Sequence, residues 1–178
     1  SRFPAHAAAT QDLDDPASTR WAVLVGVNEH QGTVRDNIGS RQDAESLYAH
    51  LLDQGWSADH VLLLTDELAT RETIIEAIRW LARSTTADST AVFSYSGHAK
   101  QWWGVDMDGD GEVPDEGLWP TDNLHIVDGE LVELMAQVDA GRMWVNIMAC
   151  EAEGLLHLAG GVEIVDGVHS IHGSLTFR

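Results

Sequence analysis

The amino-acid sequence predicts an α/β fold built around a mainly parallel sheet. Short apolar runs of strand length alternate along the chain with segments whose apolar residues recur at helical spacing. The apolar runs are nearly continuous, as expected of strands covered on both faces. Strands that alternate with helices form parallel βαβ units with right-handed crossovers. A chain of 178 residues is long enough to form one domain with a substantial core.

The first predicted unit begins with the run WAVLVGV, residues 21–27, which we assign to a buried strand. A loop follows, and Ser40 is then placed to cap a helix that ends near Gly55. The apolar face of that helix, at positions i, i+3, i+4, i+7 and i+8, consists of Ala44, Leu47, Tyr48, Leu51 and Leu52.

The second unit repeats this order. The run HVLLLT, residues 60–65, predicts the second strand, and Thr70 is placed to cap the helix that follows it. The run TAVFSYS, residues 90–96, predicts the third strand. The helix between them has an apolar face formed by Ile74, Ala77, Ile78 and Leu81.

The next part of the chain is acidic and rich in loops from residue 99 to 127, where GLWPTD and LHIV are short enough to form a small hairpin. Asp128 then caps a third helix, and residues 142–149 form the fourth strand. The third helix presents Leu131, Leu134, Met135 and Val138. Residues 1–20 are expected to be a flexible lead-in, and residues 155–178 offer at most one or two weak strands.

The charge balance restricts the class of partner. Ten Lys and Arg residues against 29 Asp and Glu residues give a net charge of −19, which disfavours nucleic acid and anionic membranes and favours basic peptides or cations such as Ca²⁺. The longest apolar runs are far shorter than the roughly 20 residues that span a bilayer. The single cysteine excludes an internal disulfide framework and fits the reducing cytoplasm.

Two residues that can carry chemistry follow the third and fourth strands. His98 comes after the third strand and Cys150 after the fourth. Open parallel sheets bind ligands beyond the carboxyl ends of their strands, and neighbouring strands lie about 5 Å apart. If these strands are neighbours, the histidine can raise the thiolate fraction of the cysteine and protonate a leaving amine. The alternative is a small buried cysteine and an unrelated histidine in a surface turn.

Several segments also resemble a known family. VLVGVNEH, NIGSRQDAESLYAHLL, LLTDELATRETIIEAIRWLA, AVFSYSGHA, GLWPTDN and MACEAEG are similar to the catalytic domain of caspase-like cysteine peptidases, nearest to bacterial metacaspases, over residues 21–154. In caspases the histidine precedes the cysteine by about 50 residues; here positions 98 and 150 differ by 52. The resemblance implies a caspase-like α/β/α sandwich, here its large-subunit portion, and an endopeptidase with a Cys–His dyad.

The resemblance also implies roles for individual residues. Cys150 is the nucleophile, His98 is the general acid and base, and the backbone N–H of Ala99 helps to hold the oxyanion, although most relatives have glycine at that position. Asp43 and Ser96 match residues of an acidic site that selects Arg or Lys before the cut. Met148 stands where many metacaspases have a second aspartate. Alternatively, Asp43 only stabilises its helix through the macrodipole.

The acidic stretch DMDGDGEVPDEG, residues 106–117, suggests a calcium site. Asp106, Asp108 and Asp110 occupy positions 1, 3 and 5 of a loop like that of an EF-hand, but position 12 is glycine. A nearby acid, Glu112, Asp115 or Glu116, can take the place of the missing bidentate ligand. The resemblance adds that some metacaspases need Ca²⁺. The alternative is a solvated acidic loop with Asp-Gly turns.

The sequence leaves competing functions open. The first is an endopeptidase that cuts protein or peptide substrates after Arg or Lys, processes itself after Arg178 and works with a separate small subunit. Alternatively, Arg178 is simply a boundary of a shortened domain. A second function is an inactive caspase-like scaffold that binds protein partners or calcium. A third, an unrelated α/β hydrolase, is weakened because the chain has neither a Gly-rich phosphate loop nor a G-x-S-x-G elbow.

Overall fold

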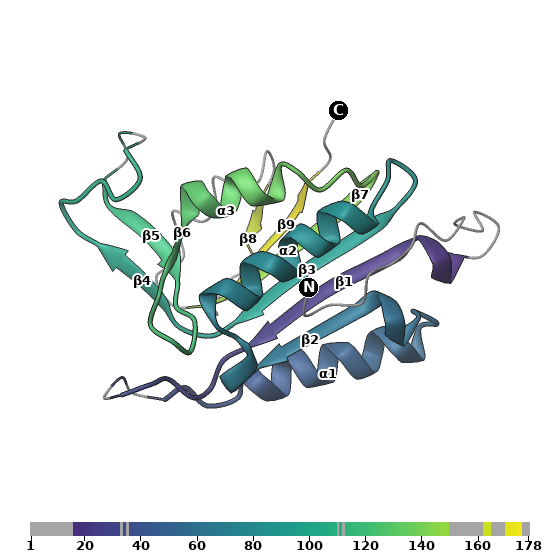
Figure 1. The fold of residues 1–178 in the computed structure, drawn as a ribbon, viewed down its shortest axis with the longest axis horizontal. Helices are drawn as coiled ribbons and strands as arrows, with labels where there is room; N and C mark the ends of the chain where they lie inside the picture. The colour runs from purple at the N-terminus through teal and green to yellow at the C-terminus, as the bar shows by residue number, and fades with distance from the viewer. Residues whose placement is uncertain are drawn as a thin grey trace.

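The fold is a twisted six-stranded sheet with helices on both faces (Figure 1). The computed structural model describes residues 16–32, 34, 36–109, 111, 113–149, 162–164 and 170–175. Across the sheet, the strands are β2 (Val61–Thr65), β1 (Arg20–Gly26), β3 (Thr90–Ser96), β7 (Arg142–Met148), β9 (Ser170–Leu175) and β8 (Val162–Ile164). The predicted α/β class with a mainly parallel sheet is confirmed.

The four strands predicted from apolar runs form the parallel part of the sheet. β1 pairs with both β2 and β3, and β3 pairs with β7 in parallel register. β1 is almost entirely buried because helices cover both faces of this central strand. β9 runs antiparallel to β7, and β8 runs antiparallel to β9, so the sheet continues beyond β7 within this chain.

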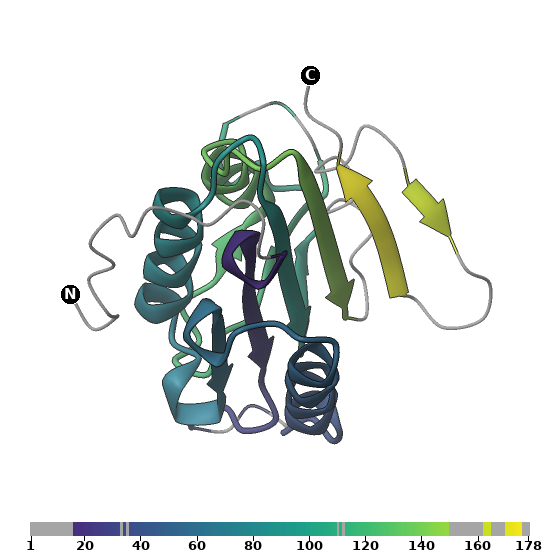
Figure 2. The same ribbon diagram turned by 90° about the vertical axis from the view of Figure 1, so that its right-hand side faces the viewer.

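Helix α1 (Ser40–Asp53) covers one face of the sheet (Figure 2). Its predicted apolar face packs against Ala22, Leu24, Val61 and Val92 of the sheet. The helix begins one residue earlier than a serine cap requires, because Gly39 is the N-cap and Ser40 is the first helical residue, so the predicted cap is wrong.

Helices α2 (Arg71–Ser84) and α3 (Asp128–Met135) lie on the opposite face (Figure 2). The Thr70 cap is confirmed, because its side-chain oxygen accepts the Thr73 N–H at 3.2 Å. The Asp128 cap is wrong: Val127 is the N-cap, and Asp128 is the buried first residue of α3. The larger core cluster joins these helices to the sheet through residues such as Ile74, Ile78, Phe93, Leu131 and Met143.

A second, three-stranded sheet continues from the end of β3. It consists of β4 (Ala99–Trp102), β5 (Asp115–Leu118) and β6 (Ile126–Val127), all antiparallel. The predicted hairpin corresponds to β5 and β6. β4 was expected to be loop, because four half-buried residues without an apolar alternation carry little strand signal.

Short 3₁₀ helices complete the described elements. η1 (Pro16–Thr19) precedes β1 in the segment expected to be a flexible lead-in, whereas η2 (Ala58–His60) and η3 (Asp66–Leu68) flank β2. No helix among the described residues is both long enough and apolar enough to cross a bilayer.

Helix α1 closely approaches β1 at Gly26. A Cβ atom there would lie 2.5 Å from the Ser40 carbonyl oxygen and 2.8 Å from the Ala44 Cβ.

We expect Gly26→Ala to lower the free energy of unfolding by about 1–3 kcal/mol, because the helix must shift away from β1. Urea denaturation measures the change, and Ser46→Ala on the exposed side of α1 should stay within about 0.5 kcal/mol of the parent. Equal stability of the Gly26→Ala variant would contradict this packing.

Candidate functional site at the carboxyl edge of the sheet

The register of β3 and β7 defines the candidate site. Ser96 is the partner of Met148, and the Gly97 N–H donates to the Met148 carbonyl oxygen at 3.2 Å. The predicted adjacency of the third and fourth strands is therefore confirmed. His98 follows Ser96 by two residues, and Cys150 follows Met148 by two residues. Cys150 itself lies outside the described residues, so the predicted dyad stays a prediction.

The backbone of His98 is fixed by two groups. Its carbonyl oxygen accepts the Trp119 N–H at 3.1 Å and lies 2.8 Å from the hydroxyl of the buried Tyr95. Burial raises the pKa of that hydroxyl, which therefore stays a neutral donor. A Cβ at Gly97 would lie 2.6 Å from the same hydroxyl, so glycine is required at this turn. The sequence predicted that Tyr95 lies in a strand, but it did not predict that its hydroxyl contacts the His98 carbonyl oxygen.

The same contacts orient the peptide between His98 and Ala99. In a trans peptide the carbonyl oxygen and the amide hydrogen point in opposite directions. Because the His98 carbonyl faces Trp119 of the neighbouring segment, the Ala99 N–H points away from β5. This N–H is the one that the sequence analysis assigned to the oxyanion, and its direction is compatible with that role.

His30, which the sequence analysis did not single out, stacks on the His98 ring. The ring centroids are 5.1 Å apart and the planes are inclined by 28°. His30 is 8% exposed, and neither ring nitrogen has a well-aligned hydrogen-bond partner within the described residues. Burial, followed by the nearby His98, lowers the pKa of His30, while the Pro120 backbone, Asp36 and Asp66 oppose that shift. The His30 ring, whose pKa is lowered, thus packs against the His98 imidazole.

The loop that carries His30 is held by Asp66. One oxygen of this buried carboxylate accepts the N–H groups of Asn28 and Glu29 at 2.8 and 3.1 Å, and the other lies 3.3 Å from Arg41. Asp66 adopts φ 44°, a left-handed conformation that a non-glycine residue rarely adopts. No local pattern marks such a residue, because its partners lie on two distant segments.

Asp43 and Ser96, predicted together as substrate-binding residues, are brought together by the fold. The Ser96 hydroxyl donates to Asp43 Oδ2 at 2.9 Å, across 53 positions of sequence. Asp43 lies in the first turn of α1 and is exposed, whereas Ser96 is buried at the end of β3. The pair therefore presents an oriented carboxylate at the same edge of the sheet as His98. A role in substrate binding remains a proposal.

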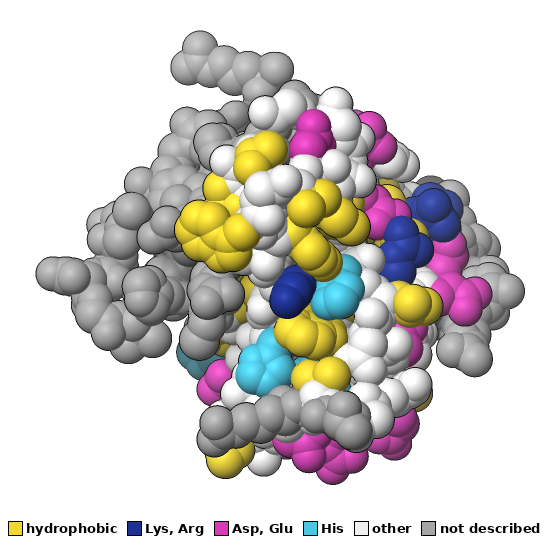
Figure 3. Space-filling view, turned by 90° about the vertical axis from the view of Figure 1, so that its left-hand side faces the viewer, with side chains coloured by type: hydrophobic (Ala, Val, Ile, Leu, Met, Phe, Trp, Pro, Cys, Tyr) yellow, Lys and Arg dark blue, Asp and Glu magenta, His cyan; other side chains and the backbone are white. Residues whose placement is uncertain are grey.

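Beyond His98, the site continues as an aromatic surface. Trp119 lies 6.2 Å from His98 and 4.9 Å from His125, and Trp102 meets His125 edge-on at 4.9 Å, all between ring centroids. Lys100 Nζ lies 5.8 Å from the centroid of the Trp119 ring. Figure 3 shows histidine, hydrophobic and basic side chains gathered at the centre of this face.

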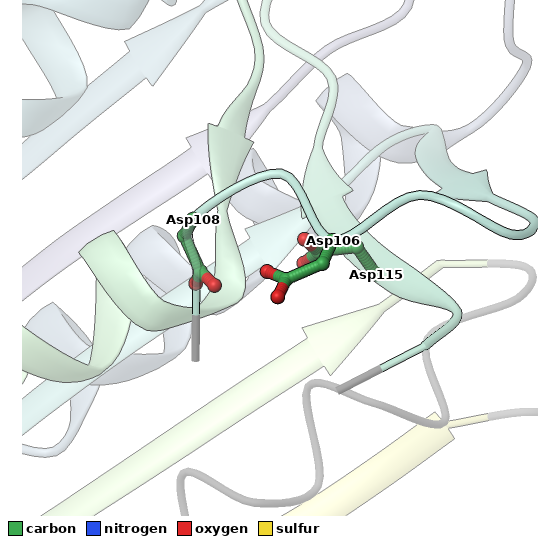
Figure 4. A group of neighbouring side chains, drawn as sticks. All are labelled: Asp106, Asp108 and Asp115. Carbon is green, nitrogen blue, oxygen red and sulfur yellow. The ribbon is translucent and has the colours of Figure 1, made fainter. Parts of the chain in front are cut away.

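Two aspartates on the loop between β4 and β5, together with the first residue of β5, form a carboxylate cluster. Oxygens of Asp106, Asp108 and Asp115 all lie within 4.8 Å of one another (Figure 4). Asp106 and Asp108 were predicted metal ligands, whereas the third, Asp110, lies outside the described residues. The loop joins two strands, and Asp115, one of the three acids considered as a substitute ligand, completes the described cluster.

Asp128 adds a fourth carboxylate beside this cluster. It is 5% exposed, and its Oδ1 has no hydrogen-bond partner among the described residues. Burial, followed by the neighbouring Asp115 and Asp108, raises the pKa of Asp128 to about 7. The exposed Asp106 turns both oxygens toward backbone N–H groups of Gly109 and Gly111. Hard oxygen donors and a buried carboxylate oxygen without a hydrogen-bond partner fit a Ca²⁺ ion, which takes six to eight oxygen ligands.

Comparison with known proteins agrees with this geometry. A mainly parallel sheet with helices on both faces brings the YSGH turn beside the end of β7, as the resemblance to caspase-like α/β domains implies. The family model described as metacaspase, peptidase C14 domain, matches residues 20–159. The chain therefore belongs to the metacaspase family, which confirms the resemblance inferred from the sequence.

Individual relatives extend the comparison. The chain is 31% identical over 163 residues to metacaspase-3 of Arabidopsis thaliana, covering 83% of this chain and 44% of the relative. It is 31% identical over 153 residues to metacaspase-1 of Schizosaccharomyces pombe, covering 78% and 35%, respectively. The crystal structure of protein GSU0716 from Geobacter sulfurreducens matches with a TM-score of 0.63 and 26% identity, over 74% of this chain and half of that one. The chain thus spans less than half the length of these curated relatives.

Proposed function

We propose that the chain is a cysteine endopeptidase in which Cys150 attacks the peptide bond and His98 transfers the protons. The observation that carries the proposal is the β3–β7 register, in which Ser96 and Met148 are partners and each proposed catalytic residue follows two positions later. Family membership supports the same reaction class. A thiolate nucleophile also fits a reducing compartment such as the cytoplasm.

The proposed reaction proceeds through a thioester. The Cys150 thiolate adds to the substrate carbonyl carbon, and the carbonyl oxygen becomes an oxyanion held by the N–H groups of Ala99 and Cys150. The C–N bond breaks as the His98 imidazolium gives its proton to the leaving amine. Water then adds to the thioester and gives a proton to His98, and the C–S bond breaks to release the acid.

The residue before the cut is proposed to be Arg or Lys. The Asp43 carboxylate, oriented by Ser96 at 2.9 Å, offers a charged acceptor that suits a guanidinium or ammonium group. The net charge of −19 favours basic peptides over longer range. Met148, the strand partner of Ser96, adds no second charge here, so Asp43 alone supplies the carboxylate in this proposal.

Calcium is proposed as a ligand of the carboxylate cluster rather than as a participant in the chemistry. Asp106, Asp108 and Asp115 would hold the ion, with Asp128 adjacent. A divalent cation would neutralise these carboxylates and would offset the burial and the neighbouring Asp115 that raise the pKa of Asp128. Because the loop links β4, which follows His98, to β5, binding would order the segment next to the proposed general acid.

The first prediction tests the dyad. We expect Cys150→Ala and His98→Ala each to lower kcat/KM for an Arg-ended reporter peptide by at least about 10³-fold, because the two groups act as a unit. Thermal unfolding should change little, and His50→Ala, at an exposed histidine in α1, should keep full activity. A chloromethyl ketone bearing Arg should label Cys150 stoichiometrically. Absence of label together with absence of cleavage would favour the inactive scaffold instead.

The second prediction tests the residue before the cut. Asp43→Asn should lower kcat/KM for an Arg reporter by about tenfold or more and leave a matched Gln reporter almost unchanged, because only the charged side chain loses its partner. Asp53→Asn, at the exposed end of α1, is the charge-matched control. Equal losses on both reporters would show that Asp43 supports the fold of the site rather than its selectivity.

The third prediction concerns calcium. Titration with CaCl₂ should give saturable heat in calorimetry and raise the melting temperature, because the ion binds the native state alone. Asp115→Asn combined with Asp108→Asn should abolish both effects, and chelation should lower peptidase activity of the parent chain. Asp88→Asn, in an exposed loop, controls for the loss of charge. A parent chain with no binding heat at millimolar Ca²⁺ would contradict the site.

A further inference from the structure

Lys100 is the only lysine in the 178 residues, and it lies next to the proposed catalytic histidine. Alternate residues of a strand share one face, so His98, Lys100 and Trp102 project from the same side of the segment that forms β4. Residues two apart on a strand are about 7 Å apart, which places Lys100 one step beyond His98. The chain has 29 acidic residues, and its one lysine lies beside the proposed general acid, where a positive charge can contact the substrate.

The surroundings of Lys100 leave its charge available. Its Nζ lies over the Trp119 ring at 5.8 Å, and no carboxylate within 4.0 Å pairs with it among the described residues. By contrast, the four ion pairs found in the described part of the chain all engage arginines: Arg41 with Glu45 and Asp66, Arg71 with Glu130, and Arg79 with Glu76. The side chain is half-buried, so it is partly removed from solvent screening.

The neighbouring histidine does not compete for this role. Burial, followed by the Lys100 charge, lowers the pKa of His125. His125 is therefore the neutral member of the pair, and Lys100 is the cation of this aromatic surface. An ammonium over an indole ring is held by the ring face while its remaining N–H groups stay free to donate.

The direction of the substrate follows from the proposed function, on which this inference rests. Ser96, which is bonded to Asp43, ends β3 two residues before His98, and Lys100 lies in β4 two residues after it. A general acid must face the nitrogen that leaves, so the peptide passes from the Asp43 carboxylate, across His98, toward β4. An extended peptide advances about 3.3 Å per residue, which brings its first or second residue after the cut beside Lys100.

We propose that Lys100 is a specificity-determining residue that binds an acidic side chain at the first or second position after the cleaved bond. The preferred substrate would thus carry a basic residue before the cut and Asp or Glu just after it. Trp119 and Trp102 would pack against the aliphatic part of that side chain. The Lys100 ammonium would select a carboxylate locally, although the net charge of −19 repels acidic peptides at longer range.

Peptides that differ only in charge test this proposal. Four substrates carry Arg before the cut and Gln-Gln, Glu-Gln, Gln-Glu or Glu-Glu after it. The parent chain should cleave the better Glu peptide with a kcat/KM about fivefold above the Gln-Gln peptide, as expected for one partly screened ion pair. The preference should shrink as NaCl is raised.

Three variants separate specificity from structure. Lys100→Met should lower cleavage of the Glu peptides more than that of the Gln-Gln peptide and so remove the preference. Lys100→Arg should keep the preference, and Lys100→Glu should reverse it toward peptides with Lys after the cut. Arg83→Met, at an exposed position of α2, removes the same charge at a distance and should behave as the parent. A parent chain without any preference for Glu, or equal losses on all four peptides in Lys100→Met, would overturn the proposal.

A binding measurement keeps the test independent of turnover. Calorimetry with the Cys150→Ala variant should show tighter binding of the Glu peptide than of the Gln-Gln peptide, and Lys100→Met in the same background should abolish the difference. If the parent chain cleaves nothing, the endopeptidase proposal fails, yet this arm still decides whether Lys100 binds a carboxylate. Equal affinities for both peptides would reject the role of Lys100 even in an active enzyme.

Discussion

The parallel pairing of β3 with β7 is the constraint on which the candidate site depends. A parallel ladder ends both strands at the same edge, so whatever follows Ser96 and Met148 emerges side by side. The Gly97 N–H bonded to the Met148 carbonyl extends the pairing by one step beyond the strand. A shift of register by two residues would separate the two following segments by about 7 Å and would destroy any shared chemistry.

The contacts around the turn after β3 hold the peptide group between His98 and Ala99 in one orientation. Tyr95 fills the space beneath Gly97 and, with the Trp119 N–H, holds the His98 carbonyl, while His30 supports the ring of the same residue. These contacts come from three separate segments, so the local conformation is determined by the whole fold. Such rigid support suits a group that transfers protons, because its position relative to the substrate must stay fixed to within less than about 1 Å.

Much of the fold was predictable from local patterns, and the site was predictable only in part. Buried parallel strands leave continuous apolar runs, and α2 carries a Thr70 cap that the sequence shows directly. The roles of Asp66 and His30 were not predictable, because each is defined by partners far away in sequence. Asp115 was one of three acids considered as the missing ligand, and only the fold brings it together with Asp106 and Asp108. The predicted caps at Ser40 and Asp128 were wrong because serine and aspartate also occur at the first helical position. At that position the side chain does not cap the N–H groups at the start of the helix.

The isolated ε-amine of Lys100 has a practical consequence. Acylating reagents that spare arginine would find one lysine in the whole chain, located on the aromatic surface beside His98. A reporter group attached there would need no engineered attachment point, and its emission would respond to the indole of Trp119 and to anything that displaces solvent nearby. Lys100 is thus a native labelling site at which a fluorescent probe can report ligand binding.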